Sequence, residues 1–160
     1  MSRRKPYVPK SFESVKGSGD TSANIYKTMQ NHAAWKCLSP TQKVLYLACK
    51  AERYGKKKHD LDSFGQQYRT DPTVFTFNRS KWKKGIEGSY DLYSNQNQFY
   101  KDMDSLIKHG FIDCVICGKS TRTKSLYRFS SRWQFWGTDQ FSLPASVMTD
   151  SLLHKQAPII

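Results

Sequence analysis

The segment from residue 93 to residue 128 constrains the fold most, because it changes abruptly from a helical to a β-strand pattern. Phe99, Met103, Leu106 and Ile107 recur at the spacing i, i+4, i+7 and i+8, which places them in one apolar stripe on an α-helix. Ser94 is a favourable N-cap residue, and a glycine at 110 can take the left-handed conformation that ends a helix. The pattern therefore predicts a helix over residues 94–110 with a signal at each end.

A β-hairpin is predicted directly after this helix. Residues 111–117 are mostly β-branched and apolar, and residues 125–129 alternate between apolar and polar side chains. The segment between them, residues 118–124, is polar and basic and begins with a glycine that can start the turn. The hairpin is expected to span about residues 111–130.

Two helices are predicted before this segment. In residues 23–36, Ile25, Met29 and Ala33 recur every four residues, which predicts an amphipathic helix that ends near Trp35. The run Ser39-Pro40-Thr41-Gln42 then offers an N-cap serine, a proline at the first helical position and a glutamine placed for a capping box. The apolar residues that follow predict a central buried helix that ends near Gly55.

The remaining segments have weaker patterns. Residues 55–72 lack a period and predict a long loop, residues 73–77 alternate as a short strand, and Asn78 can cap a brief helix through Lys84. The aromatic run 133–136 is expected to pack back onto the helices, and a last helix is expected from residue 144 to residue 153. We expect a disordered basic tail over 1–22, a single domain over 23–154 and a frayed C-terminus over 155–160.

The charge of the chain points to a polyanionic partner. The 160 residues carry a formal net charge of +13, and the isoelectric point is near 9.7. Nucleic acid is favoured over an anionic membrane because no basic amphipathic helix with an aromatic face is evident. A solubilising surface is the alternative explanation. There is no apolar run of about 18 residues and no signal-peptide pattern after residue 6, so we expect a cytoplasmic protein without membrane contact.

The run Leu106-Ile107-Lys108-His109-Gly110-Phe111-Ile112 resembles the junction between the last helix and the wing of a winged helix-turn-helix domain. With the opening Leu38-Ser39-Pro40, the chain from residue 33 to residue 132 resembles replication-initiator-like DNA-binding proteins of Gram-positive plasmids and integrative mobile elements. The resemblance implies a mainly α fold with a small β-hairpin (α+β), a winged helix-turn-helix with extra N-terminal and C-terminal helices. It also implies sequence-selective binding of double-stranded DNA, in replication initiation or transcription regulation, without catalysis.

One segment departs from this family's pattern. Residues 85–93 are longer than the tight turn of a simple helix-turn-helix, which puts the usual angle between its two helices in doubt.

Candidate DNA contacts lie on the predicted helix and around the hairpin. Opposite the apolar stripe lie Asn97, Lys101, Asp104 and Lys108, and amides suit an adenine edge while lysines suit guanine or phosphate. The alternative is that residues 95–98 only start the helix. The residues expected to contact DNA are Ser94, Asn97, Gln98, Tyr100, Lys101, Lys108, Lys81, Lys83, Lys84, Lys119, Thr121, Arg122 and Lys124.

Metal and catalytic motifs are weak. Cys114 and Cys117 have the spacing of half a zinc knuckle without a second pair, and strand alternation would turn them to opposite faces. We expect reduced thiols, no metal and no other cofactor, with zinc as the alternative. The sequence lacks a Walker loop, H-E-x-x-H and G-x-S-x-G, so a non-enzyme is predicted. A metal-dependent nuclease that uses Asp60 and Asp62 is the catalytic alternative.

A second function remains open from the sequence. The chain could serve as a protein-interaction module of a replication or transfer complex, with other replication or transfer proteins as partners and only non-specific affinity for nucleic acid. Structured RNA is an open ligand, because phosphate contacts look alike in RNA and DNA. The oligomeric state is also open, a homodimer included.

Overall fold

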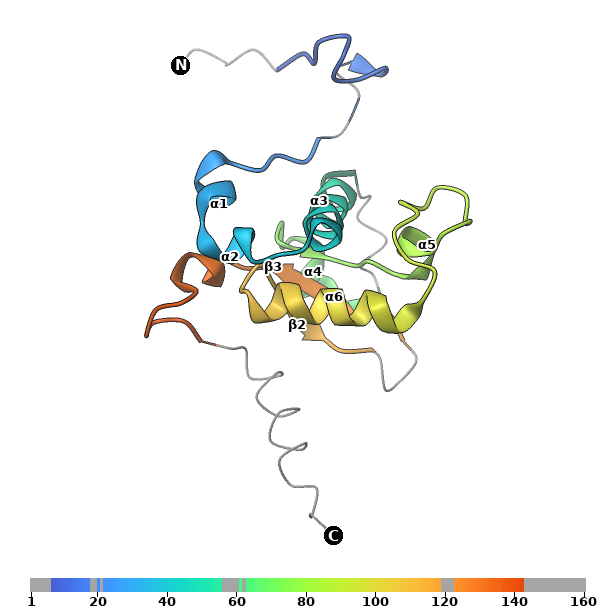
Figure 1. Ribbon diagram of the computed structural model, residues 1–160. Coiled ribbons are helices and arrows are strands. Elements are labelled where there is room, and N and C mark those ends of the chain that lie inside the picture. The colour runs from blue at the N-terminus through green and yellow to red at the C-terminus, as the bar shows by residue number, and fades with distance from the viewer. Residues whose placement is uncertain are drawn as a thin grey trace.

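The computed structural model describes residues 7–17, 20, 22–55, 61, 63–118 and 123–142. It has the mixed α+β class expected from the sequence, with helices packed on a small antiparallel sheet (Figure 1). In chain order the elements are α1 (Lys27–Asn31), α2 (Ala33–Lys36), α3 (Pro40–Gly55), α4 (Gln66–Arg69), β1 (Val74–Phe75), α5 (Arg79–Trp82), α6 (Gln96–Lys108), β2 (Ile112–Ile116), β3 (Leu126–Phe129) and the 3-10 helix η3 (Arg132–Phe135).

The helix predicted over residues 94–110 is observed as α6, and its apolar stripe is buried as expected. Phe99, Met103, Leu106 and Ile107 are each at most 4% exposed. The predicted N-cap is one residue early: the Asn95 side chain, rather than Ser94, accepts a hydrogen bond from the backbone N–H of Asn97 at 2.7 Å.

The end of α6 requires a glycine. Gly110 has φ +84°, and a Cβ atom there would lie 2.5 Å from the backbone nitrogen of Trp133. The prediction of a left-handed glycine is confirmed, and the close approach of residues 132 and 133 adds a steric reason for it.

The predicted hairpin is part of a three-stranded sheet in the order β1-β3-β2. β3 pairs antiparallel with β2 on one side and with β1 on the other, where Phe75 lies opposite Tyr127. The sequence predicted a strand over residues 73–77, but only its first half pairs, and residues 74–77 are all buried. This short third strand is what attaches the hairpin to the middle of the chain.

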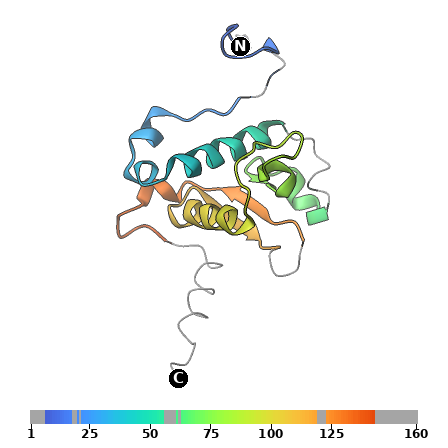
Figure 2. The same ribbon diagram turned by 45° about the vertical axis from the view of Figure 1, so that its right-hand side comes forward.

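Both faces of the sheet are covered. α3 and α6 pack against one face, and Figure 2 shows α3 running above the strands and α6 in front of them. On the other face Leu61, Val74 and Leu126 form a second small core with Phe64 and Tyr68. The described part of the predicted loop 55–72 therefore contains α4 and covers apolar strand residues that would otherwise meet water.

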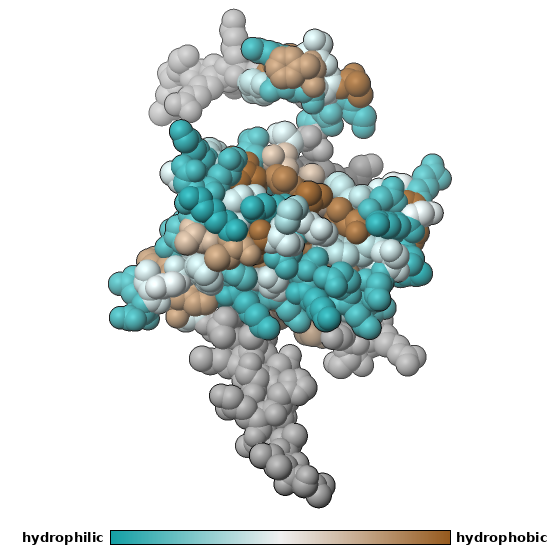
Figure 3. Space-filling view, in the orientation of Figure 1, coloured by the Kyte–Doolittle hydropathy of each residue, from teal (hydrophilic) through white to brown (hydrophobic). Residues whose placement is uncertain are grey.

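The start of α3 is formed as predicted. The Ser39 backbone N–H donates to Gln42 Oε1 at 3.0 Å, and the Gln42 backbone N–H donates to Ser39 Oγ at 3.2 Å. Leu45 and Cys49 are fully buried, but Val44 is 48% exposed, so only one side of this helix is central. Figure 3 shows hydrophobic side chains at the surface over α3.

The helix predicted over residues 23–36 is instead two short helices. His32 between them has an extended backbone, and its side chain accepts a hydrogen bond from the backbone N–H of Ala34 at 3.1 Å. That side-chain cap satisfies a donor at the start of α2 and breaks the continuous helix. Ala33 is exposed, whereas Ala34 and Trp35 are buried.

The aromatic run after β3 packs largely as predicted. Trp133 stacks on Phe111 with ring centroids 6.0 Å apart, and Trp136 stacks on His109 at 5.2 Å. Phe135 is 42% exposed, so the prediction is wrong for that residue. The helix predicted over 144–153, the frayed C-terminus and the tip of the hairpin lie outside the described residues.

Candidate nucleic-acid interface

The loop before α6 sets the position of that helix beside α5. Residues 83–93 leave α5 and return to it, because the backbone N–H groups of Leu92 and Tyr93 donate to the Trp82 carbonyl at 3.1 and 2.9 Å. The Lys84 backbone N–H also donates to the Tyr93 carbonyl at 2.9 Å. The long loop predicted from the sequence is therefore closed at its base, and α5 and α6 remain neighbours in spite of it.

A stacked aromatic pair joins the two helices. Trp82 of α5 and Phe99 of α6 lie parallel, with ring centroids 4.8 Å apart and an interplanar angle of 13°. Both side chains are nearly fully buried. This contact holds the first turns of α6 against α5 and leaves the opposite side of α6 uncovered.

The uncovered side of α6 carries four polar residues of the predicted contact face. Asn97, Lys101, Asp104 and Lys108 are exposed, as their helical spacing predicts. Figure 3, in which α6 lies toward the viewer, shows hydrophilic residues gathered over this helix. Lysines and amides along one accessible helix side are groups that can hydrogen bond to bases and phosphates.

Three residues predicted to contact DNA make contacts within the protein. Lys81 forms a salt bridge with Glu52 of α3 at 3.0 Å, and the Lys83 ammonium donates to the Ser94 carbonyl at 2.6 Å. The Gln98 side-chain amide donates to Asp102 Oδ1 at 3.2 Å. These side chains therefore support the fold around the start of α6.

The other predicted contacts are distributed over several elements. Ser94 and Lys84 are exposed before α6, Tyr100 is half-buried on it, and Lys124 is exposed just before β3. Lys119, Thr121 and Arg122 lie outside the described residues.

Asp102 is the one acidic side chain on α6 that is buried, at 4% exposure. It accepts hydrogen bonds from the Tyr93 hydroxyl at 2.6 Å, from Gln42 Nε2 at 3.1 Å and from Gln98 at 3.2 Å. Burial, together with the neighbouring Asp102 carboxylate, raises the pKa of Tyr93. This network could not be predicted from the sequence, because Asp102 and Asp104 look equivalent on either side of Met103.

Two cations of the segment between residues 114 and 138 also hold the structure together. Arg128 pairs with Asp71 at 3.2 Å, and Arg132 pairs with Asp113. Arg132 also donates to the carbonyls of Ile107 and Ile112 at 3.0 and 3.2 Å. The positive charge available to a ligand is therefore smaller than the sequence suggests.

A groove between α5, α6 and β3 contains residues that the sequence did not single out. It has a volume of about 220 Å³, and Arg79, Gln96 and Ser125 line it together with the predicted residues Tyr100 and Lys124. Arg79 sits in the short helix after Asn78, and Gln96 begins α6. Of these three new residues, only Gln96 lies in a segment that the sequence singled out, the polar run 95–98.

The two neighbouring cysteines are brought together by an irregularity in β2. The register shifts between Cys114 and Ile116, so regular alternation does not apply and the two thiols need not lie on opposite faces. Burial, followed by the effect of Cys117, raises the pKa of Cys114 to about 12. Among the described residues no group of three or more His, Cys, Asp or Glu side chains is placed to hold a metal ion.

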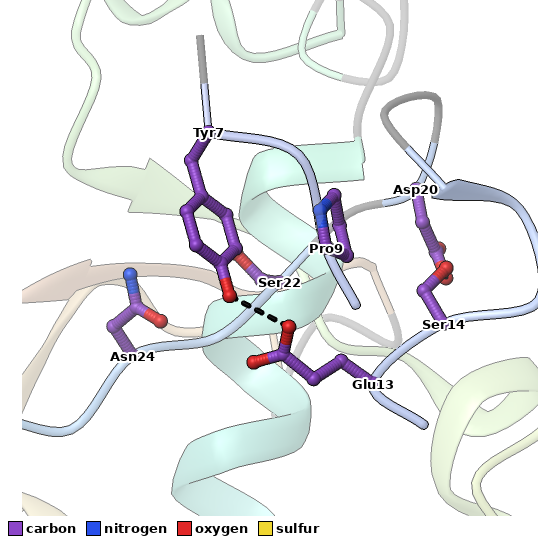
Figure 4. Close-up of a pocket in the computed structure, with 7 residues that line it drawn as sticks. All are labelled: Tyr7, Pro9, Glu13, Ser14, Asp20, Ser22 and Asn24. Carbon is purple, nitrogen blue, oxygen red and sulfur yellow. Dashed lines mark hydrogen bonds between the residues drawn. The ribbon is translucent and has the colours of Figure 1, made fainter. Parts of the chain in front are cut away.

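The described N-terminal residues form a separate small structure that stands away from the body of the protein (Figure 1). Figure 4 shows its pocket of about 500 Å³, in which the Tyr7 hydroxyl donates to Glu13 at 2.6 Å. Four large apolar side chains of this segment are well exposed: Tyr7 (72%), Val8 (63%), Phe12 (83%) and Val15 (101%). Such exposure in a short segment is typical of a protein contact.

No protein family model, no curated protein and no solved structure matches this chain. In the described part of the chain, no helix has both the length and the apolar character needed to cross a membrane.

Proposed function

We propose that this protein is a winged-helix protein that binds double-stranded DNA with sequence selectivity through α6. The observation that carries the proposal is the exposed polar side of α6, held beside a β-hairpin whose connecting segment is basic. Apart from the short helix α4 between α3 and β1, the element order α3, β1, α5, α6, β2, β3 corresponds to the expected series of helix, strand, short helix, recognition helix and wing. The proposed role is replication initiation or transcription regulation on a mobile element.

The proposal assigns base selection and sequence-independent affinity to different side chains. Asn97 on α6 has an amide that can donate to and accept from an adenine edge, which supports base selection. Lysines contribute affinity that does not depend on sequence, because each neutralised phosphate releases counterions. α6 carries both kinds of group on one accessible side, in Asn97, Lys101 and Lys108.

The test is selection of a preferred sequence from random duplexes at about 150 mM salt, followed by binding measurements on that sequence. Asn97→Ala is expected to weaken specific binding by about 1–3 kcal/mol and to relax preference at one position. Lys101→Ala is expected to weaken binding to all sequences and to lower the salt slope by about 0.9. Lys36→Ala, which removes an exposed lysine on α2, is the matched control and should change neither property.

A second function is supported by the exposed apolar residues of the N-terminal segment. A protein-interaction module would use Tyr7, Val8 and Phe12 to bind a protein of a replication or transfer complex. It predicts equal binding to all duplexes, a steep salt slope and no enriched sequence. A selected motif that is lost on Asn97→Ala would instead support the DNA-reading function.

A further inference from the structure

The groove between α5, the start of α6 and β3 has cationic residues on its rim and, unlike two other pockets of the protein, no acidic residue among the described residues that line it. The rim cations are Arg79 and Lys124. By contrast, the pocket of the N-terminal segment contains Glu13, and the pocket beside the start of α3 contains Asp102. An anion would therefore be favoured in this groove over the other two.

Both rim cations are available to a ligand. Within the described part of the chain, neither Arg79 nor Lys124 is in a salt bridge, and both side chains are exposed. Lys81, two residues after Arg79, is by contrast paired with Glu52. Lys81 is therefore held in a salt bridge within the protein, whereas Arg79 and Lys124 can interact with a ligand in the groove.

The walls of the groove add a second kind of chemistry. The Tyr100 ring is half-buried there, next to Phe99 with centroids 5.2 Å apart, and it offers an apolar surface beside the cations. The Gln96 side chain is exposed at the same place and can donate to an anionic oxygen. A ligand that is anionic at one end and apolar at the other would match this arrangement.

The size of the groove argues for part of a polymer rather than a whole small molecule. Its volume of about 220 Å³ is below the range of roughly 300–1,000 Å³ that is usual for small-molecule sites. A deoxyribose-phosphate unit has one anionic group and a sugar with an apolar face. It can enter the groove while the rest of the strand continues past it.

We propose that this groove seats one deoxyribose-phosphate unit of a DNA strand, with Arg79 and Lys124 on the phosphate and Tyr100 against the sugar. This inference rests on the proposed function, because it assumes that α6 enters the major groove and that the hairpin contacts the adjacent groove. The backbone that separates these two DNA grooves then crosses between α6 and the hairpin. The protein groove is lined from α5, α6 and the start of β3, so it lies at that crossing point.

The test combines single neutral phosphates with protein variants. Each phosphate of the selected duplex is replaced in turn by an uncharged methylphosphonate, and affinity is measured for the wild type, Arg79→Ala, Lys124→Ala and the control Lys36→Ala. At one position the substitution should weaken wild-type and Lys36→Ala binding about tenfold. The same substitution should have a smaller effect, about threefold, in Arg79→Ala and in Lys124→Ala, because each variant has already lost one of the two contacts to that phosphate.

The outcomes separate the two proposals. One outcome is that the wild type binds its selected duplex, but no phosphate substitution has a smaller effect in Arg79→Ala or Lys124→Ala than in the wild type. The proposed phosphate contact in the groove is then overturned and the DNA-binding function stands. If the wild type prefers no duplex sequence, the proposed function is overturned, and the proposed phosphate contact in the groove is overturned with it. Arg79 lies on α5 and Lys124 just before β3, and both are exposed. If one variant misfolds, as its thermal melt would show, the other still tests the proposed phosphate contact.

Discussion

The polar side chains on the two sides of α6 differ in their hydrogen-bond partners. On the side that faces Tyr93 and the start of α3, Asp102 and Gln98 have protein partners that include Gln42. On the outward side, Asn97 and Lys101 meet solvent. One helix therefore carries polar groups that stabilise the fold on one side and polar groups that can bind a ligand on the other.

This difference cannot be recognised from residue type. The inward side has the amide of Gln98 and the carboxylate of Asp102. The outward side has the amide of Asn97 and the carboxylate of Asp104, and all four residues lie within about two turns of the helix. What separates the two aspartates is burial, because a buried polar group without a partner destabilises the fold, whereas an exposed one is satisfied by water. The two amides are both exposed, and they differ in that the Gln98 amide donates to Asp102. Substitutions on the two sides should consequently affect different measurements.

The largest effect is expected for Asp102→Ala. Removal of the buried carboxylate leaves the Tyr93 hydroxyl and the Gln42 amide without their acceptor, and should lower the free energy of unfolding by about 3 kcal/mol. Asp104→Ala, on the outward side, should change it by less than about 0.5 kcal/mol. Urea unfolding of both variants measures the difference, and similar losses would contradict the comparison between the two sides.

A smaller loss of stability, about 2 kcal/mol, is expected for Arg132→Ala. Its guanidinium joins Asp113 to the carbonyls of Ile107 and Ile112, so the end of α6 and the start of β2 would lose a shared donor. Lys124→Ala is the matched change of an exposed cation near the same hairpin and should leave stability unchanged. The thermal midpoints of the two variants measure this, and an equal shift would mean that Arg132 is not a structural cation.

The parts of this fold that local sequence determines were predicted well. The stripe of Phe99 and Met103, the glycine at 110 and the capping box at Ser39 each depend on residues within a few positions of one another. The break at His32 also has a local cause, but the periodic stripe around it gave a stronger and opposite signal. Local patterns therefore located the main helices and missed one interruption.

The distribution of contacts at the candidate site depends on distant partners and could not be predicted. Asp102 is separated by 60 positions from Gln42, and Arg128 by 57 from Asp71. The groove likewise combines Arg79, Gln96 and Lys124 from three segments. Which cations are free to bind a ligand is decided only when these segments are brought together.

Alkaline pH should destabilise the inward side of α6 selectively. Burial, then Asp102, raises the pKa of Tyr93 above its ordinary 10.0 in the folded protein, with a further contribution from Cys49. Its neutral hydroxyl thus contributes stability that is complete below pH 10.0 and is lost as pH rises above it. In wild type the free energy of unfolding should fall above pH 10 by up to about 1.4 kcal/mol per pH unit for this group alone.

Tyr93→Phe identifies that contribution. The variant keeps the ring in the core and removes the titrating hydroxyl, so its stability should fall less steeply above pH 10.0 than that of wild type. Tyr90, whose pKa burial raises to about 12, remains in both proteins and gives them a common background slope. Urea midpoints across this pH range measure the two slopes, and identical slopes would exclude Tyr93 as the source.

The smallest and most selective effects are expected from the two neighbouring amides at the start of α6. Gln98→Ala removes one of three donors to Asp102 and should lower the free energy of unfolding by about 0.5–1 kcal/mol without altering the preferred DNA sequence. Asn97→Ala should do the reverse, because both side chains are exposed but, in the described part of the chain, the hydrogen bond of Asn97 is made by its backbone N–H to Asn95 and not by its side chain. Each variant is measured by urea unfolding and by binding to the selected duplex and to a scrambled one. A change of sequence preference in Gln98→Ala would place DNA recognition on the inward side as well, and the division between the two sides of α6 would then be wrong.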